Sequence, residues 1–157
     1  MIAVSRIVKA KYASSAFDGE GARINGGRWN SPGRPVVYTA SSAALAVLEI
    51  LVHLGSATIL QSYVLATCTF EEALVSRLDR SALPSNWRSY PAPPELQLVG
   101  DEWLKRRGTA VLEVPSVIIE TESNYLLNPA HPDFALVTIA APRPFEFDLR
   151  LLATRNT

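Results

Sequence analysis

One carboxylate in an apolar segment is the side chain of this sequence with the clearest capacity for chemistry. Glu49 lies in ALAVLEILVHL, and this composition predicts a helix over 43–54 that is buried on most sides. Burying an unpaired charge is costly, so we expect Glu49 to have a cationic partner or to open onto a polar cleft. The alternative is a Glu49 that reaches solvent on a narrow helix face beside His53, its i+4 neighbour.

A glycine loop that carries an arginine precedes this helix. Gly26 and Gly27 allow the backbone to take positive φ or to approach a ligand closely, and Arg28 and Trp29 follow at once. The next four residues, NSPG, are all turn formers. The sequence therefore predicts a shaped loop that offers a guanidinium, and Arg28 is the nearest candidate in sequence to partner Glu49.

A second arginine falls on the inward face of a predicted strand at the N-terminus. Ile2, Val4, Arg6 and Val8 alternate with the intervening residues at the period of a half-buried strand. The planar fork of Arg6 suits a carboxylate or a phosphate. The alternative is a strand-edge arginine that reaches water along its own stem.

Two further polar residues lie where predicted strands are interrupted. Ser116 follows a proline at the end of the strand predicted over 109–114. It lacks a G-x-S-x-G elbow, and only His53 and His131 could act as an imidazole base, so we interpret it as a hydrogen-bonding residue rather than a nucleophile. Asn128, in the proline-rich NPAHP loop, could hold a ligand hydroxyl or merely fix its own turn.

The remaining pattern is rich in strands and contains two clear helices. Ser41 or Ser42 is a suitable N-cap for the helix over 43–54, which Gly55 would end. A second helix is predicted over 95–107, after a proline-rich loop over 90–94 and before Gly108. Strands are predicted over 36–39, 58–70, 109–114, 134–140 and 145–150 in addition to the first. We expect one α/β (α+β) domain over 1–157, with a mixed sheet around the helix 43–54.

Composition narrows the classes of function. The 157 residues are 48% hydrophobic, and fifteen basic and fifteen acidic residues cancel, which argues against direct binding to nucleic acid. The chain has no apolar run long enough for a membrane span and no secretory signal pattern, so we expect a cytoplasmic protein. Cys68, the single cysteine, is predicted to be a small core residue.

Neither a bound metal nor a dinucleotide carrier is expected. Glu49 and His53 share a helix face, but two ligands without a third are a weak metal site and H-E-x-x-H is absent. No G-x-G-x-x-G loop follows a predicted strand, which argues against a Rossmann site.

These residues together resemble a known signature. Arg28 in GGRWN, Tyr38 in VVYTA, Glu49 in the apolar helix, Ser116 in LEVPS and the downstream NYLLNPAHPDF are similar to the RES domain, the toxin half of bacterial RES–Xre toxin–antitoxin pairs. The resemblance implies a fold like that of ADP-ribosyltransferases. It also implies an enzyme that consumes NAD+ at its nicotinamide–ribose bond, arrests growth, and is restrained by a helical Xre-type antitoxin.

The resemblance also implies roles for individual residues, with NAD+ as substrate and no other cofactor. Glu49, Arg28 and Tyr38 would be catalytic, and Arg6, Arg28, Tyr38, Ser116 and Asn128 would bind substrate. Because the nicotinamide leaves as a neutral base, a single carboxylate that stabilises an oxocarbenium-like transition state can suffice. We further expect a homodimer within the antitoxin complex.

Three outcomes stay open from the sequence. The ADP-ribosyl group can pass to water or phosphate, or it can pass to a side chain of a host protein, as in an ADP-ribosyltransferase. The alternative from another class is a non-catalytic binding module in which Arg28 and Glu49 form only a structural salt bridge.

Overall fold

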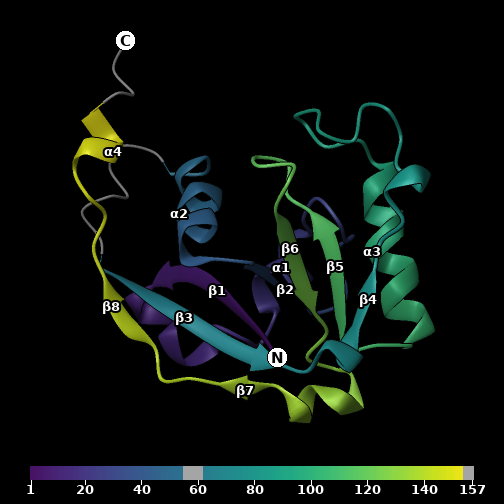
Figure 1. The fold of residues 1–157 in the computed structure, drawn as a ribbon, viewed down its shortest axis with the longest axis horizontal. Coiled ribbons are helices and arrows are strands. Elements are labelled where there is room, and N and C mark those ends of the chain that lie inside the picture. The colour runs from purple at the N-terminus through teal and green to yellow at the C-terminus, as the bar shows by residue number, and fades with distance from the viewer. Residues whose placement is uncertain (55–61, 154–157) are drawn as a thin grey trace.

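The computed structural model describes residues 1–54 and 62–153, and its strands form one curled, mixed sheet (Figure 1). The order of the strands is β4-β5-β6-β2-β1-β3-β7, with β8 paired to β3. Only β4 and β5 run parallel; the other pairs are antiparallel. The strands are β1 (Ile2–Lys9), β2 (Val37–Ala40), β3 (Tyr63–Phe70), β4 (Val75–Arg77), β5 (Val111–Pro115), β6 (Ser123–Leu127), β7 (Thr138–Ile139) and β8 (Arg143–Phe145).

Helices cover different parts of this sheet. The α-helices are α1 (Glu20–Asn25), α2 (Ala43–Leu51), α3 (Glu95–Arg106) and α4 (Arg150–Ala153), and short 3-10 turns span Ala10–Ser15, Glu72–Leu74, Arg80–Ala82 and Pro132–Leu136. In Figure 1, α2 lies above β1, whereas α3 lies apart from it, beside β4 and β5. The core accordingly falls into separate clusters, one beneath α2 and another between α3 and the strands β5 and β6. None of the helices in the described ranges has the length and apolar character of a membrane-spanning segment.

The mixed α/β class expected from the sequence is confirmed, as are most of the local elements. The strands β1 and β2 and the helix α2 lie where their patterns place them. The half-buried alternation predicted for β1 is wrong, because Ser5 and Ile7 are buried as well as Val4 and Val8, and Ile7 packs under α2. Ser42 caps α2, since its side chain accepts a hydrogen bond of 3.0 Å from the Leu45 N–H. Helix α3 ends with Arg107 in the left-handed conformation, one residue before the glycine expected to stop it.

Helix α2 is shorter and less enclosed than its composition predicts. It ends at Leu51 rather than at residue 54, and the glycine expected to stop it lies outside the described residues. The prediction of burial on most sides is wrong, because the sheet covers only the face that carries Leu45 and Ala46, while Val52, just after the helix, is 59% exposed.

Three strand predictions need correction at their boundaries. The strand expected over 134–140 is confined to β7, because Phe134 belongs to a 3-10 turn that His131 caps by accepting from the Asp133 N–H. The terminal strand expected over 145–150 is instead β8 followed by a loop and α4. The strand predicted over 58–70 is observed from Tyr63 on, and its first part falls on residues 58–61, outside the described ranges.

Candidate active site

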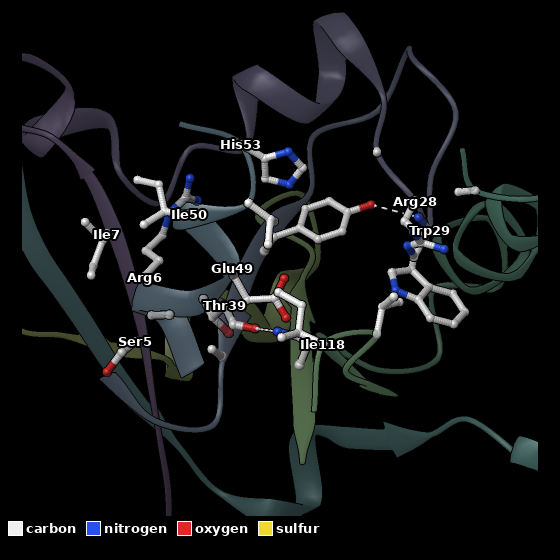
Figure 2. A pocket seen from close by; sticks show the side chains of 18 of the residues that line it. Ser5, Arg6, Ile7, Arg28, Trp29, Thr39, Glu49, Ile50, His53 and Ile118 are labelled. Atoms are coloured by element: carbon white, nitrogen blue, oxygen red, sulfur yellow. Dashed lines mark hydrogen bonds between the residues drawn. The ribbon is translucent and has the colours of Figure 1, made fainter. Parts of the chain in front are cut away.

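A cavity of about 750 Å3 brings together four of the six predicted site residues, Arg6, Arg28, Tyr38 and Glu49. Its walls come from β1, the glycine loop, β2, helix α2, the proline-rich segment and the turn after β5. Figure 2 shows Glu49 in the middle of this space, with Arg6 on one side and with Arg28 and Trp29 on the other. The volume lies within the range usual for small-molecule sites.

Glu49 opens onto the cavity, which is one of the two environments expected for it. It lines the cavity from α2 and is only partly exposed. Its Oε1 accepts a hydrogen bond of 3.1 Å from the hydroxyl of Ser116, which is fully buried. Arg28 and Glu49 form no ion pair, although both are described and line the same space. The carboxylate is therefore fixed in position while its charge stays available to a ligand.

The glycine loop is shaped by contacts to Tyr38 on β2. The Tyr38 hydroxyl donates a hydrogen bond of 2.5 Å to Asn30 Oδ1 and accepts one of 3.1 Å from the Trp29 N–H. A Cβ on Gly27 would lie 2.6 Å from that hydroxyl, so only glycine lets the loop approach the ring this closely. Gly26 has a φ of 70°, in the region that favours glycine. Burial raises the pKa of Tyr38, and its hydroxyl is protonated at neutral pH.

The guanidinium of Arg28 ties the segment 87–89, just before the proline-rich loop, to the cavity wall. Its Nη1 donates to the carbonyl oxygens of Trp87 and Ser89 at 3.0 and 3.1 Å. Burial lowers the pKa of Arg28, and the charge of Glu49 partly offsets this effect. Arginine remains charged despite such a shift, so the cavity has a fixed positive group at this end.

Arg6 supplies a second positive group at the other end. Its Nε is buried and, in the described part of the chain, has no hydrogen-bond partner. Burial lowers the pKa of Arg6, with Asp18 acting in the opposite direction. A buried donor without a partner is costly, and an anionic ligand in the adjoining cavity would satisfy it.

Ser116 and Asn128, the other two residues predicted to bind substrate, do not line the cavity. Ser116 is not part of the cavity wall, and its hydroxyl contacts the Glu49 carboxylate from outside the cavity. Asn128 is buried at the far end of β6, where its Oδ1 accepts from the Ala130 N–H at 3.0 Å. Of the two interpretations left open for Asn128, the geometry favours the one in which it fixes its own turn.

The sequence interpretation missed several residues of the site. The sequence pattern predicts Asn30 only as a turn former, yet it is fully buried. Its side chain accepts from the Tyr38 hydroxyl and donates to the Ala22 carbonyl at 3.1 Å. Asn124 and Tyr90 line the cavity, and Asn124 donates to the Thr39 carbonyl at 3.2 Å. For Asn30, the available signal in the sequence was its position directly after a tryptophan in a glycine loop. Asn124 and Tyr90 reach the cavity through contacts between segments far apart in the sequence.

Within residues 1–54 and 62–153, no three residues of the types His, Cys, Asp and Glu gather where they could hold a metal ion. The site instead offers one oriented carboxylate between two guanidinium groups, a set suited to a ligand with an anionic part and a centre that develops positive charge.

Comparisons with known proteins agree on one family. Residues 3–148 match the family model described as the RES domain. A protein named Toxin Res from Yersinia enterocolitica is 41% identical over 147 residues, 93% of this chain and 97% of that protein. A protein named Prs ADP-ribosylating toxin from Sphingobium sp. is 40% identical over 144 residues, 90% of this chain and 89% of that protein.

The fold has a counterpart among solved structures. A chain in the crystal structure of the M. tuberculosis MbcT–MbcA toxin–antitoxin complex matches with a TM-score of 0.78 at 20% identity, covering 99% of this chain and 90% of that chain. At this identity the likeness shows a shared fold. Because the family model spans nearly the whole chain and the relatives match almost end to end, this protein belongs to the RES domain family.

Proposed function

We propose that this protein is the toxin of a toxin–antitoxin pair and that it degrades NAD+ by cleaving the nicotinamide–ribose bond, by hydrolysis or phosphorolysis. Relatives that match nearly its whole length carry the name Toxin Res. NAD+ is then a substrate that is consumed, and no further cofactor is needed. Depletion of this shared cofactor would arrest growth.

The charge arrangement of the cavity supports this reaction. NAD+ carries an anionic pyrophosphate, which Arg6 and Arg28 can bind as bidentate donors. Its nicotinamide is already cationic and leaves as a neutral base, so no general acid is required. The carboxylate of Glu49 stabilises the positive charge that develops on the ribose, and the ring of Tyr38 can pack against the nicotinamide.

The observation that carries the proposal is the placement of Glu49. Its carboxylate faces a cavity of ligand size, is oriented by a buried serine hydroxyl, and is not neutralised by an ion pair with Arg28. A structural role for the pair, as in a binding module without catalysis, would place the two charges in contact. A preorganised carboxylate that Arg28 does not neutralise is what differential stabilisation of a cationic transition state requires.

One observation favours a second candidate function. The Sphingobium relative is named an ADP-ribosylating toxin. In that reaction the same bond is broken and a side chain of a host protein replaces water or phosphate as the acceptor. The two functions share the site and differ only in what attacks the ribose.

The proposed partner is an antitoxin of the Xre type that occupies the cavity. The fold counterpart was solved as part of a toxin–antitoxin complex. The simplest block is a carboxylate of the partner that binds Arg6 and Arg28 in place of the pyrophosphate. We also propose that the toxin acts in the cytoplasm and pairs as a homodimer within the complex, which sedimentation of the purified complex would test.

Nicotinamide release from NAD+ tests the function directly. The purified wild type should release nicotinamide, and Glu49→Gln, which keeps the shape of the side chain but removes its charge, should not. Product analysis with and without phosphate, and then labelling of a cell lysate with radioactive NAD+, separates hydrolysis, phosphorolysis and protein modification. Folded wild type that releases no nicotinamide in any of these assays would favour the binding module.

A further inference from the structure

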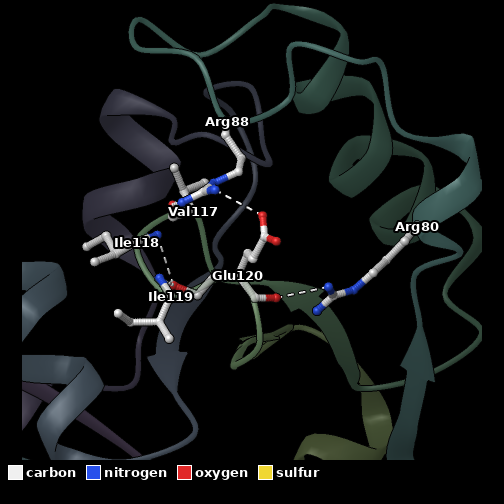
Figure 3. Close-up of polar contacts among 7 residues, drawn as sticks. Arg80, Arg88, Val117, Ile118, Ile119 and Glu120 are labelled. Atoms are coloured by element: carbon white, nitrogen blue, oxygen red, sulfur yellow. Dashed lines mark hydrogen bonds and ion pairs between the residues drawn. The ribbon is translucent and has the colours of Figure 1, made fainter.

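The turn that follows β5 is held from the outside by two arginines (Figure 3). Arg88 donates from Nε and Nη2 to the Val117 carbonyl at 3.1 and 3.0 Å, and from Nη1 to the Glu120 carboxylate at 2.9 Å. Arg80 donates from Nη1 to the Glu120 carbonyl at 2.9 Å. The functions assigned so far explain neither arginine.

The contact between Arg88 and Val117 is the outer end of a series of hydrogen bonds that leads to Glu49. The Val117 carbonyl and the Ile118 N–H belong to the same planar peptide group. That N–H donates to Ser116 Oγ at 3.2 Å, and Ser116 Oγ donates to Glu49 Oε1 at 3.1 Å. A surface guanidinium is thus connected to the carboxylate in the cavity through one peptide group and one hydroxyl.

Hydrogen bonds arranged in series strengthen one another. A guanidinium on the carbonyl side polarises the peptide, so its N–H donates more strongly to Ser116 Oγ, whose own O–H then donates more strongly to Glu49. The peptide group is also fixed in orientation, because its oxygen and its N–H are both bound. The direction of the Ser116 hydroxyl depends on that orientation.

Arg88 also lies in the segment that Arg28 holds. The carbonyls on either side of it, at Trp87 and Ser89, are the two acceptors of Arg28 Nη1. The segment 87–89 therefore contacts both sides of the cavity. Its backbone carbonyls bind Arg28, and the side chain of Arg88 binds the turn that leads to Glu49. This arrangement sets the spacing between the two charged groups of the site.

We propose that Arg88 is a positioning residue, which acts through the Val117–Ile118 peptide and Ser116 to hold Glu49 in its reactive orientation. This inference rests on the proposed cleavage of NAD+. The effect comes from the carbonyl contact. The ion pair of Arg88 with Glu120 is exposed, with side chains 46% and 58% accessible, and such pairs contribute little.

Steady-state kinetics of nicotinamide release tests this role. Arg88→Ala should lower kcat by about 10- to 100-fold and leave KM within about 3-fold, because the orientation of Glu49 matters most in the transition state. Arg88→Lys should restore part of kcat, since one ammonium can still reach the carbonyl. Two controls should stay within about 2-fold of the wild type: Glu120→Gln, which removes only the exposed ion pair, and Arg106→Ala, which removes an exposed pair on α3.

A double-mutant cycle separates positioning from general loosening. In a Ser116→Ala variant the series of hydrogen bonds from Arg88 to Glu49 is already broken. Adding Arg88→Ala should then change kcat by less than about 2-fold relative to Ser116→Ala alone. If the two substitutions instead lower kcat by independent factors that multiply, Arg88 does not act through Ser116 and the proposal is overturned.

Amide hydrogen exchange measures the same contact without relying on activity. In the 15N-labelled full chain, Arg88→Ala should speed exchange of the Ile118 and Ile119 amides, both of which donate to Ser116 Oγ at 3.2 Å, whereas Arg106→Ala should leave them unchanged. If the wild type releases no nicotinamide, the proposed function falls and exchange alone decides whether Arg88 orders this turn. Unchanged exchange in Arg88→Ala would overturn the proposal in either case.

Discussion

Ser116 and Glu49 lie 67 residues apart in the chain, and the serine hydroxyl donates its one proton to the glutamate carboxylate across 3.1 Å. The direction of that proton is fixed, because the oxygen also accepts from the N–H groups of Ile118 and Ile119 at 3.2 Å each. A hydroxyl has one donor and two acceptor positions, and all three are used here. Ser116 therefore orients the carboxylate of Glu49 with its one hydroxyl proton.

Replacing Ser116 by alanine should affect both catalysis and stability. Ser116→Ala should lower kcat for nicotinamide release by about 10- to 100-fold with a small change in KM, since Glu49 loses its orienting donor. The free energy of unfolding should fall by about 1–3 kcal/mol, because two N–H groups lose their acceptor at a buried site. Kinetics and urea unfolding measure the two effects. A normal kcat in a destabilised variant would show that the serine is only structural.

Local chemistry allowed part of this architecture to be predicted. The extent of β1 and the serine before α2 depend on nearby residues alone, and the structure has both where their patterns predict them. The presence of Glu49 in an apolar helix indicated a cationic partner or a polar cleft for a physical reason, the cost of burying a lone charge. That argument did not depend on knowing the fold.

The contacts that could not be predicted from the sequence are those between residues far apart in the chain. Ser116 meets Glu49, and Trp87 and Ser89 meet Arg28, only because strands and loops distant in sequence are neighbours in the sheet. The apolar composition of α2 likewise does not say which of its faces the sheet covers, so Val52 was expected to be buried and is exposed. Local patterns in a single sequence do not predict which distant segments will come into contact.

Two helical glycines should respond in opposite ways to the same substitution. A Cβ on Gly100 of α3 would lie 1.8 Å from the Trp29 carbonyl oxygen, so Gly100→Ala must push α3 away from the glycine loop. We expect a loss of about 2–4 kcal/mol in the free energy of unfolding. A Cβ on Gly21 of α1 would meet nothing within 4 Å, so Gly21→Ala should stabilise by about 0.5–1 kcal/mol. Urea unfolding of both variants measures this contrast, and equal effects would contradict the close approach of α3.

Alkaline pH should weaken the fold through the buried thiol of Cys68. Burial raises its pKa to about 12, with the positive charge of Arg6 acting in the opposite direction. A group whose pKa is raised on folding contributes stability that is complete below its unfolded value, and that stability is lost as the pH rises through the folded value. The free energy of unfolding should therefore decline between about pH 9 and 12. Cys68→Ala should decline less over this interval in urea titrations, and a steeper decline would contradict the raised pKa.

Arg28 should be shared by the substrate and the antitoxin. Its Nη1 is bound to two carbonyls, and in residues 1–54 and 62–153 its Nε and Nη2 make no hydrogen bond, so these two donors are available to an anion in the cavity. Arg28→Ala should raise KM for NAD+ and weaken binding of the purified antitoxin, each by about 10-fold or more. Arg34→Ala is the matched control, because Arg34 is exposed in the same loop but does not line the cavity.

Titrating the antitoxin into the nicotinamide-release assay then decides between occlusion of the cavity and binding elsewhere. If the antitoxin enters the cavity, added antitoxin should raise the apparent KM for NAD+ without lowering the maximal rate, and excess NAD+ should displace it, since one set of arginine donors cannot bind two anions at once. The concentration of antitoxin that halves the rate should increase in Arg28→Ala and not in Arg34→Ala. A complex that forms at wild-type affinity while turnover continues undiminished would refute occlusion, and the antitoxin would then have to bind outside the space between Arg6 and Arg28.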